Sequence, residues 1–269
     1  MKKLIRKLQA KYRLLTAAKR PLPDFLIIGA QKAGTTSLYE YLKKHPNLQS
    51  NITVKEVNFF NEKFKKGFDW YRSNFPVKKE GKLYYEASPY YMINPRTPQR
   101  IHDALPDVKL IAILRNPVER AYSHYQHQVR AGRENLSFEE AIRQEASRIE
   151  GEAEKMLADP NYESYNHRKF SYIERGKYID QIKEWERYFK KEQMLILIAE
   201  EFWENPDATF KQIFDFLGVK DYPVSSGKKH NAGNYKDKMS PELRAELETL
   251  YKPYNEALYT YLGRDLGWD

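Results

Sequence analysis

The stretch Phe25-Leu-Ile-Ile-Gly-Ala-Gln-Lys-Ala-Gly-Thr-Thr-Ser-Leu38 decides the fold of this 269-residue chain. The apolar run over residues 25–28 is typical of a buried strand, and Gly29 follows it directly. A helix is expected from Thr35, a residue that can cap it, to residue 44. A strand, a glycine-containing loop and a helix in this order predict the opening of a βαβ unit.

The loop between this strand and this helix has the features of an anion cradle. Backbone N–H groups converge in such a loop, and the helix N-terminus adds positive potential. Gly29 and Gly34 have the spacing of the phosphate-binding pattern G-x-x-x-x-G-K-[ST]. Thr35 follows Gly34, however, and the lysine lies inside the loop as Lys32. The sequence therefore predicts a variant of the P-loop, with a tight strand–helix turn as the structural alternative.

The rest of the chain repeats the alternation of strands and helices. Further buried strands are expected at 83–86, 109–114 and 194–198, and helices at 97–105, 117–131, 137–148, 171–190, 206–217 and 241–262. This order predicts an α/β, P-loop-type three-layer fold with a central, mostly parallel β-sheet flanked by helices. We expect one domain over residues 24–269, in which the polar stretch 146–170 is a lid or an insertion, after an arm over residues 1–23.

The positive charge of the chain is concentrated in that arm. Residues 1–23 contain eight lysines and arginines and no acid, so they carry +8 of the formal net charge of +9. Residues 24–269 therefore carry about +1. A nucleic-acid-binding protein usually spreads its basic surface over the folded domain, so this distribution argues against a nucleic-acid partner. It also predicts no obvious basic track for a polyanion on the domain.

The arm itself reads as a basic amphipathic helix. Leu4, Leu8 and Leu15 fall near helical spacing, and positive charges occupy much of the rest. One interpretation is peripheral contact of residues 1–20 with an anionic membrane, and the other is a solvated helix that packs on its own domain. The sequence has no apolar stretch of the signal-peptide type, no run of 18 apolar residues and no cysteine. We expect a cytoplasmic location, with membrane association as an option.

A second loop leaves the expected strand at 109–114 as Arg115-Asn-Pro-Val-Glu-Arg-Ala-Tyr-Ser123. Arg115 at the strand end and Ser123 two helical turns later can both reach one phosphate. A magnesium-dependent P-loop enzyme needs an acidic residue near this strand end, and an arginine repels a metal. His124 and His127 are three residues apart on the same expected helix, but no third ligand is evident. We therefore expect no metal.

The pair of loops resembles the two nucleotide-binding loops of the PAPS-dependent sulfotransferases, which use 3'-phosphoadenosine 5'-phosphosulfate and release adenosine 3',5'-bisphosphate (PAP). The matching segments are Gln31-Lys-Ala-Gly-Thr-Thr-Ser37 and Arg115 to Ser123, about 80 residues apart. The resemblance runs from about Asp24 to the C-terminus. It is closest to the branch that contains bacterial carbohydrate sulfotransferases, heparan sulfate 3-O-sulfotransferases and the N-sulfotransferase domain.

The resemblance implies roles for residues of both loops. Lys32 would contact the bridging oxygen and stabilise the leaving phosphate, and Arg115 and Ser123 would hold the 3'-phosphate. The remaining donors to the 5'-phosphosulfate would come from Gln31, Ala33, Gly34, Thr35, Thr36 and Ser37. Farther along the chain, the resemblance places Tyr172 near the adenine and Lys228 and Lys229 in a loop that closes over the nucleotide. For Lys228 and Lys229 a polar turn before the last helix is the alternative.

A third match, Lys55-Glu-Val-Asn-Phe-Phe60, supplies the candidate general base. The heparan-type enzymes have Lys-Glu-x-x-Phe-Phe here, and the resemblance implies that Glu56 takes the proton of the acceptor hydroxyl or amine. A positioned carboxylate of suitable pKa contributes typically 10²–10⁴-fold to a rate. On the residues alone, an exposed ion pair beside an aromatic anchor is the favoured interpretation of Lys55 and Glu56, and the resemblance reverses that preference.

A fourth match, Tyr84 to Tyr90, implies acceptor-binding residues. Lys55, Glu86 and Tyr90 are the candidates, with a structural role as the alternative for Glu86 and Tyr90. Several relatives that modify glycosaminoglycans have lysine after the glutamate, where this chain has Ala87. That departure counts against heparan sulfate itself as the acceptor.

The sequence thus predicts a PAPS-dependent sulfotransferase that moves a sulfuryl group in line to a hydroxyl or amine of an acceptor, most simply a carbohydrate. Glu56 is the general base and Lys32 stabilises the leaving group, with no metal required. Two alternatives stay open. One is a nucleotide-binding or membrane-recruited protein without catalysis, and the other is a small-molecule P-loop kinase. The kinase would need a lysine at position 35 and an acid at the end of the neighbouring strand, and the chain has neither.

Overall fold

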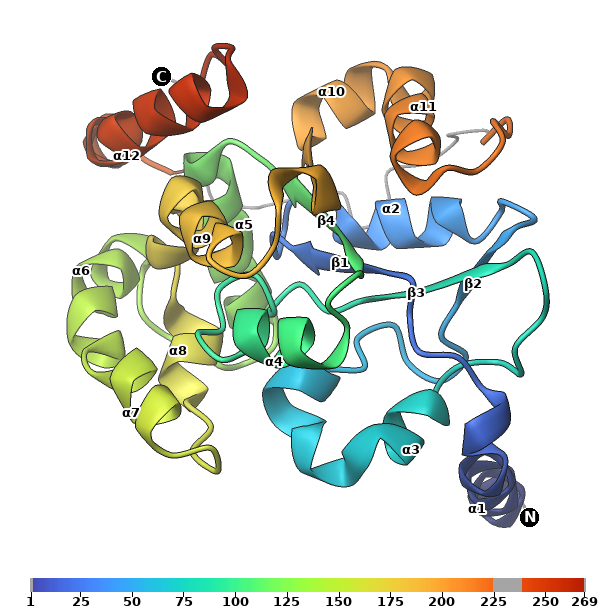
Figure 1. Cartoon of the computed structure of the whole chain (residues 1–269). Coiled ribbons are helices and arrows are strands. Elements are labelled where there is room, and N and C mark those ends of the chain that lie inside the picture. Colours follow the sequence, from blue (N-terminus) through green and yellow to red (C-terminus); the bar gives the residue numbers. More distant parts are fainter. Residues whose placement is uncertain (1, 225–238, 269) are drawn as a thin grey trace.

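A five-stranded parallel sheet forms the centre of the molecule (Figure 1). The computed structural model describes residues 2–224 and 239–268. The strands stand in the order β2-β3-β1-β4-β5, and every neighbouring pair is parallel. Their bounds are β1 Phe25–Gly29, β2 Leu48–Ser50, β3 Leu83–Ala87, β4 Lys109–Leu114 and β5 Met194–Ile198. The predicted α/β class, the parallel sheet and its four predicted strands are confirmed.

The strand that the sequence analysis missed is β2. It contains three residues and pairs with β3, where Leu48 lies opposite Leu83. Three residues are too few for a period-2 pattern, so this strand is defined by its partner rather than by its own sequence. At the centre, Phe25 of β1 lies beside Tyr85 of β3 and Lys109 of β4. All five residues of β1 are buried, as expected for a strand with helices over both faces.

Helices cover both faces of the sheet (Figure 1). Helices α2, α10 and α11 lie over one face, where Tyr41 packs edge-on against Phe202 and Phe210. Helices α4 and α9 lie over the other face, where the Trp185 indole donates to the carbonyl of Met92 at 3.0 Å. The bounds are α2 Thr35–Leu42, α4 Thr97–Ala104, α9 Tyr178–Glu186, α10 Ala199–Glu204 and α11 Pro206–Leu217.

The expected helix at 171–190 is interrupted. A short 3-10 turn, η4 (Glu174–Gly176), precedes α9, and the backbone leaves the helical region at Lys177. Gly176, a residue type that disfavours helix interiors, lies at this break, where two segments also approach closely. A Cβ atom there would lie 2.6 Å from the hydroxyl of Tyr251, so the glycine lets α12 pack against this turn.

A second apolar cluster lies beside the sheet domain. It is formed by α5 Pro117–Arg130, α6 Phe138–Ile149 and α12 Pro241–Leu262, and Val118, Phe138 and Leu247 belong to it. The stretch expected as a lid or insertion folds as two short helices, α7 Glu152–Ala158 and α8 Tyr165–Phe170. Helix α8 packs on α6, and α7 packs on α8.

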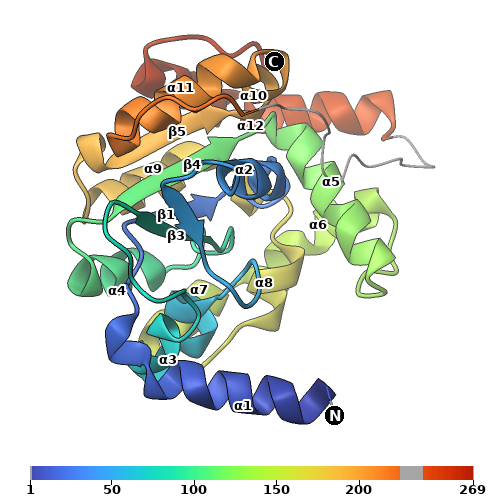
Figure 2. The same cartoon turned by 90° about the vertical axis from the view of Figure 1, so that its right-hand side faces the viewer.

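The N-terminal helix α1 Lys2–Leu15 stands outside this body, next to α3 Gly67–Arg72 (Figure 2). It is joined to the domain at Arg20, whose guanidinium donates to the carbonyl of Phe75 at 2.5 Å. In return, Arg72 donates to the carbonyl of Arg20 at 2.8 Å. Within residues 2–224 and 239–268, none of the helices has the length and apolarity needed to cross a membrane.

Candidate active site

The two loops identified in the sequence lie side by side at one edge of the sheet. The first follows β1 and the second follows β4, and these strands are neighbours in a parallel sheet. A backbone bond from Ala30 to the carbonyl of Ile113 joins them at 2.8 Å. A longer contact of 3.4 Å runs from the Arg115 guanidinium to the carbonyl of Lys32. Helices α2 and α5 both begin here, so two helix N-termini meet at this edge.

The backbone of the first loop explains its glycines. Gly34 has a φ of 108°, in the left-handed region, and a Cβ there would lie 3.3 Å from the Trp203 ring. A Cβ at Gly29 would lie 2.6 Å from Cβ of Met92, which crosses behind the loop. Lys32 also has a positive φ, of 74°, although it is not a glycine. Backbone conformations of this kind are strained for other residues and gather at ligand-binding sites.

The other candidate phosphate donors lie on or beside the first turn of α2. Thr35 and Ser37 are buried there, and Thr36 between them is partly exposed. Ala33 is buried and donates its N–H to the carbonyl of Ala30 at 3.2 Å. The structure thus brings these residues of the predicted cradle to the start of one helix.

The second loop places Arg115 and Ser123 on either side of a well-capped helix start. The Asn116 side chain accepts from the N–H groups of Val118 and Glu119 at 3.0 and 3.2 Å. This capping role of the asparagine was not inferred from the sequence. Arg115 is partly exposed and lies 3.7 Å from Glu119, and Ser123 is buried on the same helix.

Cations outnumber acids among the groups that shift the pKa of Lys32. Burial, with the cations Arg130, Arg115 and Lys55 as the next causes, lowers the pKa of Lys32 to about 8, while Glu56 acts in the opposite direction. Since neighbouring cations disfavour the charged lysine, this edge of the sheet has a surplus of positive potential. A bound anion would remove the surplus and restore the charged form of the lysine.

The surplus extends to the end of α5 and to α8. Burial, with Arg168, Arg133 and Arg175 as the next causes, lowers the pKa of Lys169 to about 8. Burial also lowers the pKa of His127 to about 4, with Lys32 and Arg130 as the next causes. These cations were not identified from the sequence, which predicted no basic track on the domain. They are spread over α5, α8 and the segments that follow them, and only the fold gathers them.

Glu56 lies in the segment between β2 and the π-helical turn η2 (Phe59–Lys63). Its carboxylate is 3.6 Å from Nζ of Lys55, and its side chain is 40% exposed. Three backbone N–H groups directly after it are held by side chains of the segment that contains β3. Val57 donates to Glu86 at 3.3 Å, Asn58 to Ser88 at 3.0 Å and Phe59 to the hydroxyl of Tyr91 at 2.8 Å.

Glu86 is the centre of that network and is fully buried. Besides the Val57 N–H, its carboxylate accepts from the hydroxyls of Tyr71, Ser88 and Tyr91 at 2.9, 2.7 and 2.7 Å. Burial raises the pKa of Glu86, and these donors act against the shift. The candidate acceptor residue Glu86 thus lies beneath the Glu56 segment, and its geometry favours the structural alternative.

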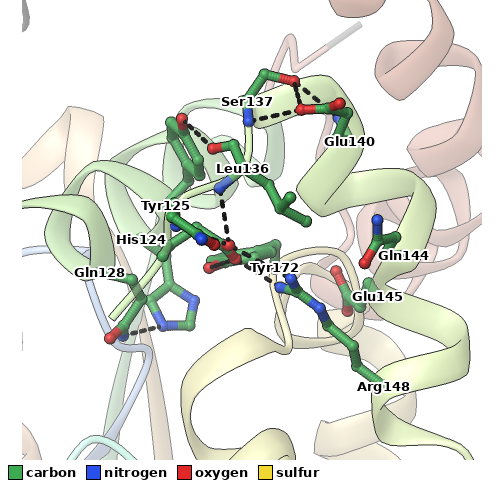
Figure 3. A network of polar contacts seen from close by, with 12 residues as sticks. His124, Tyr125, Gln128, Leu136, Ser137, Glu140, Gln144, Glu145, Arg148 and Tyr172 are labelled. Carbon is green, nitrogen blue, oxygen red and sulfur yellow. Dashed lines mark hydrogen bonds and ion pairs between the residues drawn. The ribbon is translucent and has the colours of Figure 1, made fainter. Parts of the chain in front are cut away.

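Tyr90 and Tyr172 are also buried. The hydroxyl of Tyr90 pairs with Nδ1 of His167 at 2.8 Å, under helix α8. Tyr172, expected near the adenine, lies in the polar core between α5 and α6 (Figure 3). Its hydroxyl donates to Glu134 at 2.9 Å, and Arg148 reaches the same carboxylate at 2.5 Å. Lys228 and Lys229 lie outside the described residues.

Arg175 is a further residue that the sequence analysis did not single out. Its guanidinium is fully buried and donates to the side-chain oxygen of Gln31 in the first loop. It also donates to the carbonyl of Arg168 at 2.6 Å and stacks over the ring of Tyr90, 5.1 Å from its centre. Arg175 therefore ties the phosphate loop to α8.

The histidines in the described part of the chain do not form a metal site. Over residues 2–224 and 239–268, no three histidine or acidic side chains come together in a way that could hold a metal ion. His124 is fully buried, shares a contact of 2.9 Å with Gln128 and packs on the Tyr172 ring (Figure 3). Burial holds the pKa of His124 well below its usual value, so it is neutral.

Comparisons with known proteins agree with the resemblance seen in the two loops. A family model described as the sulfotransferase domain matches residues 22–226. The chain is 31% identical to heparan sulfate glucosamine 3-O-sulfotransferase 3A1 of Mus musculus, over 95% of this chain and 67% of that protein. It therefore spans about two thirds of the length of that relative.

Solved structures give the same result. A sulfotransferase from Alicyclobacillus acidocaldarius superposes with a TM-score of 0.74 and 32% identity, over 92% of this chain and 99% of that one. The mouse sulfotransferase SULT7A1, solved in complex with PAP, is similar in fold, with a TM-score of 0.54 at 15% identity. It covers 90% of this chain and 88% of its own.

Proposed function

The chain belongs to the sulfotransferase domain family and is a PAPS-dependent sulfotransferase, and from that premise we propose that its acceptor is a carbohydrate and that Glu56 is the general base. In this proposal residues 24–269 act as one catalytic domain. The observation that carries it is the gathering of Lys32, Glu56 and Arg115 at the edge of the sheet where two helices begin.

The donor set fits a ligand with phosphate groups on both sides of a ribose. Lys32 and the backbone donors of residues 33–37 would hold the 5'-phosphosulfate, while Arg115 and Ser123 would hold the 3'-phosphate. The surplus of positive charge around Lys32 supports this assignment, because an anion stabilises the charged form of a lysine whose pKa is lowered by neighbouring cations. PAPS supplies the sulfuryl group and leaves as PAP.

Glu56 and Lys32 then have complementary tasks. Glu56 would take the proton from the acceptor hydroxyl or amine as the new bond to sulfur forms. Lys32 would stabilise the negative charge on the oxygen from which the sulfuryl group departs. The hydrogen bonds at Val57, Asn58 and Phe59 support this role for Glu56, since a general base must be held in a fixed place.

A carbohydrate acceptor is supported by two observations. The 3-O-sulfotransferase to which the chain is similar is named for a glucosamine of heparan sulfate. In addition, Lys55 pairs with Glu56, and Arg168 and Lys169 are near enough for the charge of Glu56 to act on them, although Arg168 also pairs with Glu62. Cations in this position suit an acceptor that already carries acidic groups. Ala87 is buried at the end of β3 and offers no contact in place of the lysine of the glycosaminoglycan-modifying relatives.

The experiment is a transfer assay with ³⁵S-labelled PAPS and a panel of acceptors. The panel contains uronic-acid oligosaccharides, neutral oligosaccharides and phenols. We expect label on saccharides, with acidic ones preferred, and none after Glu56→Gln. Transfer to phenols but not to any saccharide would contradict the acceptor assignment, and normal transfer by Glu56→Gln would contradict the base assignment.

The location of the enzyme is a separate proposal. We place it in the cytoplasm, with peripheral contact between residues 1–20 and a membrane. The basic composition of the arm and its exposed position outside the domain support this contact. Fractionation of expressing cells tests it: recovery with membranes, reversed by high salt, is expected, and full recovery in the high-speed supernatant would contradict it.

A further inference from the structure

Helix α1 presents an apolar face to the outside of the molecule. At about 100° per residue, five exposed apolar side chains fall within an arc of about 100° around the helix axis. They are Leu4, Ile5, Leu8, Tyr12 and Leu15, which are called here the apolar face of α1. Leu8 is 58% exposed and Leu15 is 77% exposed. Leu14 is also exposed but lies outside this arc.

The side of α1 that touches the domain is a different one. Among residues 4–15 only Arg13 is partly buried, and on the helix it lies about 180° from Leu4. A helix on the surface of a globular protein normally turns its apolar stripe towards the core. Helix α1 does the reverse, so its apolar face has no partner among the described residues.

Hydrogen bonds at residues 16–20 fix the direction of the helix relative to the domain. Thr16 follows the last residue of the helix, and its hydroxyl accepts from Nε of Arg20 at 3.1 Å. Arg20 is buried and binds the carbonyl of Phe75, and the N–H of Lys78 donates to the carbonyl of Lys19 at 3.0 Å. Figure 2 shows α1 running from residues 16–20 along the outside of the molecule.

Charge decides which partner suits this face. Residues 1–23 hold eight cations and no acid, and Lys7 and Lys11 lie close to one border of the apolar arc. A second copy of the helix would bring the same cations together at short range, which is unfavourable. An anionic lipid surface offers both the apolar interior and the opposite charge. A single helix of 14 residues is marginal in water by itself, so such a contact would also stabilise it.

We infer that α1 docks the enzyme on an anionic lipid surface through the apolar face. This deepens the proposed peripheral contact of residues 1–20 and rests on it. It specifies which face of α1 enters the lipid headgroup region and that the lipids are anionic. It also specifies that the hydrogen bonds of Arg20 fix α1 to the domain. Transfer chemistry at Glu56 does not depend on it.

The experiment uses the full chain and sedimentation with vesicles. Vesicles of phosphatidylcholine alone are compared with vesicles that also contain phosphatidylglycerol. We expect binding to the anionic vesicles and little to the neutral ones. Leu8→Glu should weaken binding by about tenfold or more, because it removes the burial of a leucine.

Ala10→Glu is the matched control. It introduces the same charge at an exposed position of the same helix, outside the apolar face, and alanine, leucine and glutamate all favour helices. It should reduce binding clearly less than Leu8→Glu. Equal losses in both variants, or no binding of the unchanged chain to anionic vesicles, would overturn the inference. The inference would also be overturned if the unchanged chain formed a dimer in the absence of vesicles and Leu8→Glu dissociated that dimer.

Calorimetric titration with PAP separates this inference from the proposed function. Both variants should bind PAP like the unchanged chain, because α1 lies apart from the phosphate loops. If vesicle binding follows the expected pattern while PAP binding fails, the nucleotide assignment is wrong and the docking inference stands. The opposite pattern leaves the enzyme assignment intact and removes the membrane contact.

Discussion

The loop around Lys32 and the segment around Glu56 both follow the carboxyl ends of strands in the same sheet, but different contacts hold them. The Lys32 loop is shaped by its own backbone, with Gly34 in the left-handed region and a helix that begins directly after it. The Glu56 segment has no regular structure, and side chains from the β3 region hold its N–H groups.

The nucleotide site at Lys32 and the proposed acceptor site at Glu56 are therefore held by separate sets of contacts within one fold. A site built from a strand, a loop and a helix recurs wherever those three elements recur. A segment held by side chains from elsewhere can change its partners without a change in the sheet. We therefore expect mutations in the Lys32 loop to change the affinity for the nucleotide. Mutations of the side chains that hold the Glu56 segment should change kcat instead.

The largest effect is expected at Glu56 itself. Glu56→Gln removes the proton acceptor and should lower kcat by about 10²–10⁴-fold. PAP affinity, measured by calorimetry, should be kept or rise slightly, because a negative charge near Lys32 is lost. Glu80→Gln, in an exposed turn before β3, is the control and should leave both quantities unchanged. A parallel loss of PAP affinity in Glu56→Gln would place Glu56 in the donor half instead.

The second test asks whether Glu86 positions the Glu56 segment or binds the acceptor. Glu86→Gln turns an acceptor of four hydrogen bonds into a group that must also donate, so the free energy of unfolding should fall by about 1–3 kcal/mol. If Glu86 positions the Glu56 segment, kcat should fall by about tenfold with little change in KM. An increase in KM with unchanged kcat and unchanged stability would show that Glu86 contacts the acceptor directly.

A third test uses the pH dependence of PAP affinity. Because the pKa of Lys32 is about 8 without an anion, Lys32 is charged below that pH and neutral above it. Affinity should therefore be high below pH 8 and fall above it, by at most about tenfold per pH unit for this one proton. Titrations near pH 8 in buffers of different ionisation enthalpy should show proton uptake.

The pKa of Lys169 is also about 8, so a variant assigns the effect. Lys169→Gln should keep the fall in PAP affinity above pH 8. Loss of the pH dependence in Lys169→Gln, with Lys32 intact, would move the titrating group to α8.

The smallest effect is expected at Tyr172. Tyr172→Phe removes the hydrogen bond to Glu134 in the core between α5 and α6 and should lower the free energy of unfolding by about 1 kcal/mol (Figure 3). PAP affinity should stay the same, since the side chain is fully buried in the structure. A clear loss of PAP affinity at unchanged stability would restore the adenine contact expected from the sequence.

Local sequence was sufficient for most of the fold. The strand at 25–28, the helix from Thr35 and the helices at 206–217 and 241–262 follow from apolar spacing, caps and glycines, and the structure has them at or near those bounds. The strand β2 was missed because three residues carry no period. The helix expected at 171–190 was too long, because the contact between Gly176 and Tyr251 comes from 75 residues farther along the chain.

The parts of the site that consist of residues close together in the sequence could be predicted. The positions of Lys32, Gly34 and Arg115 follow from two strand–loop–helix patterns, whereas the buried network of Glu86 joins residues 15 and 29 positions away. The same holds for Arg175, which meets Gln31 across 144 residues. A net charge of about +1 for the domain gave no sign that Arg130, Lys169 and Lys32 share one neighbourhood. Such gatherings depend on tertiary packing, which a single sequence does not display.

The most direct test of the central claim is calorimetric titration with PAP, compared with 5'-AMP and with ATP plus Mg²⁺. We expect tight binding of PAP without metal, much weaker binding of both other nucleotides, and a loss of about ten- to a hundredfold in PAP affinity in Arg115→Ala. AMP should bind that variant as it binds the unchanged chain. Equal affinities for PAP and AMP, or a requirement for Mg²⁺, would contradict the assignment of two phosphate sites at the start of α2 and α5.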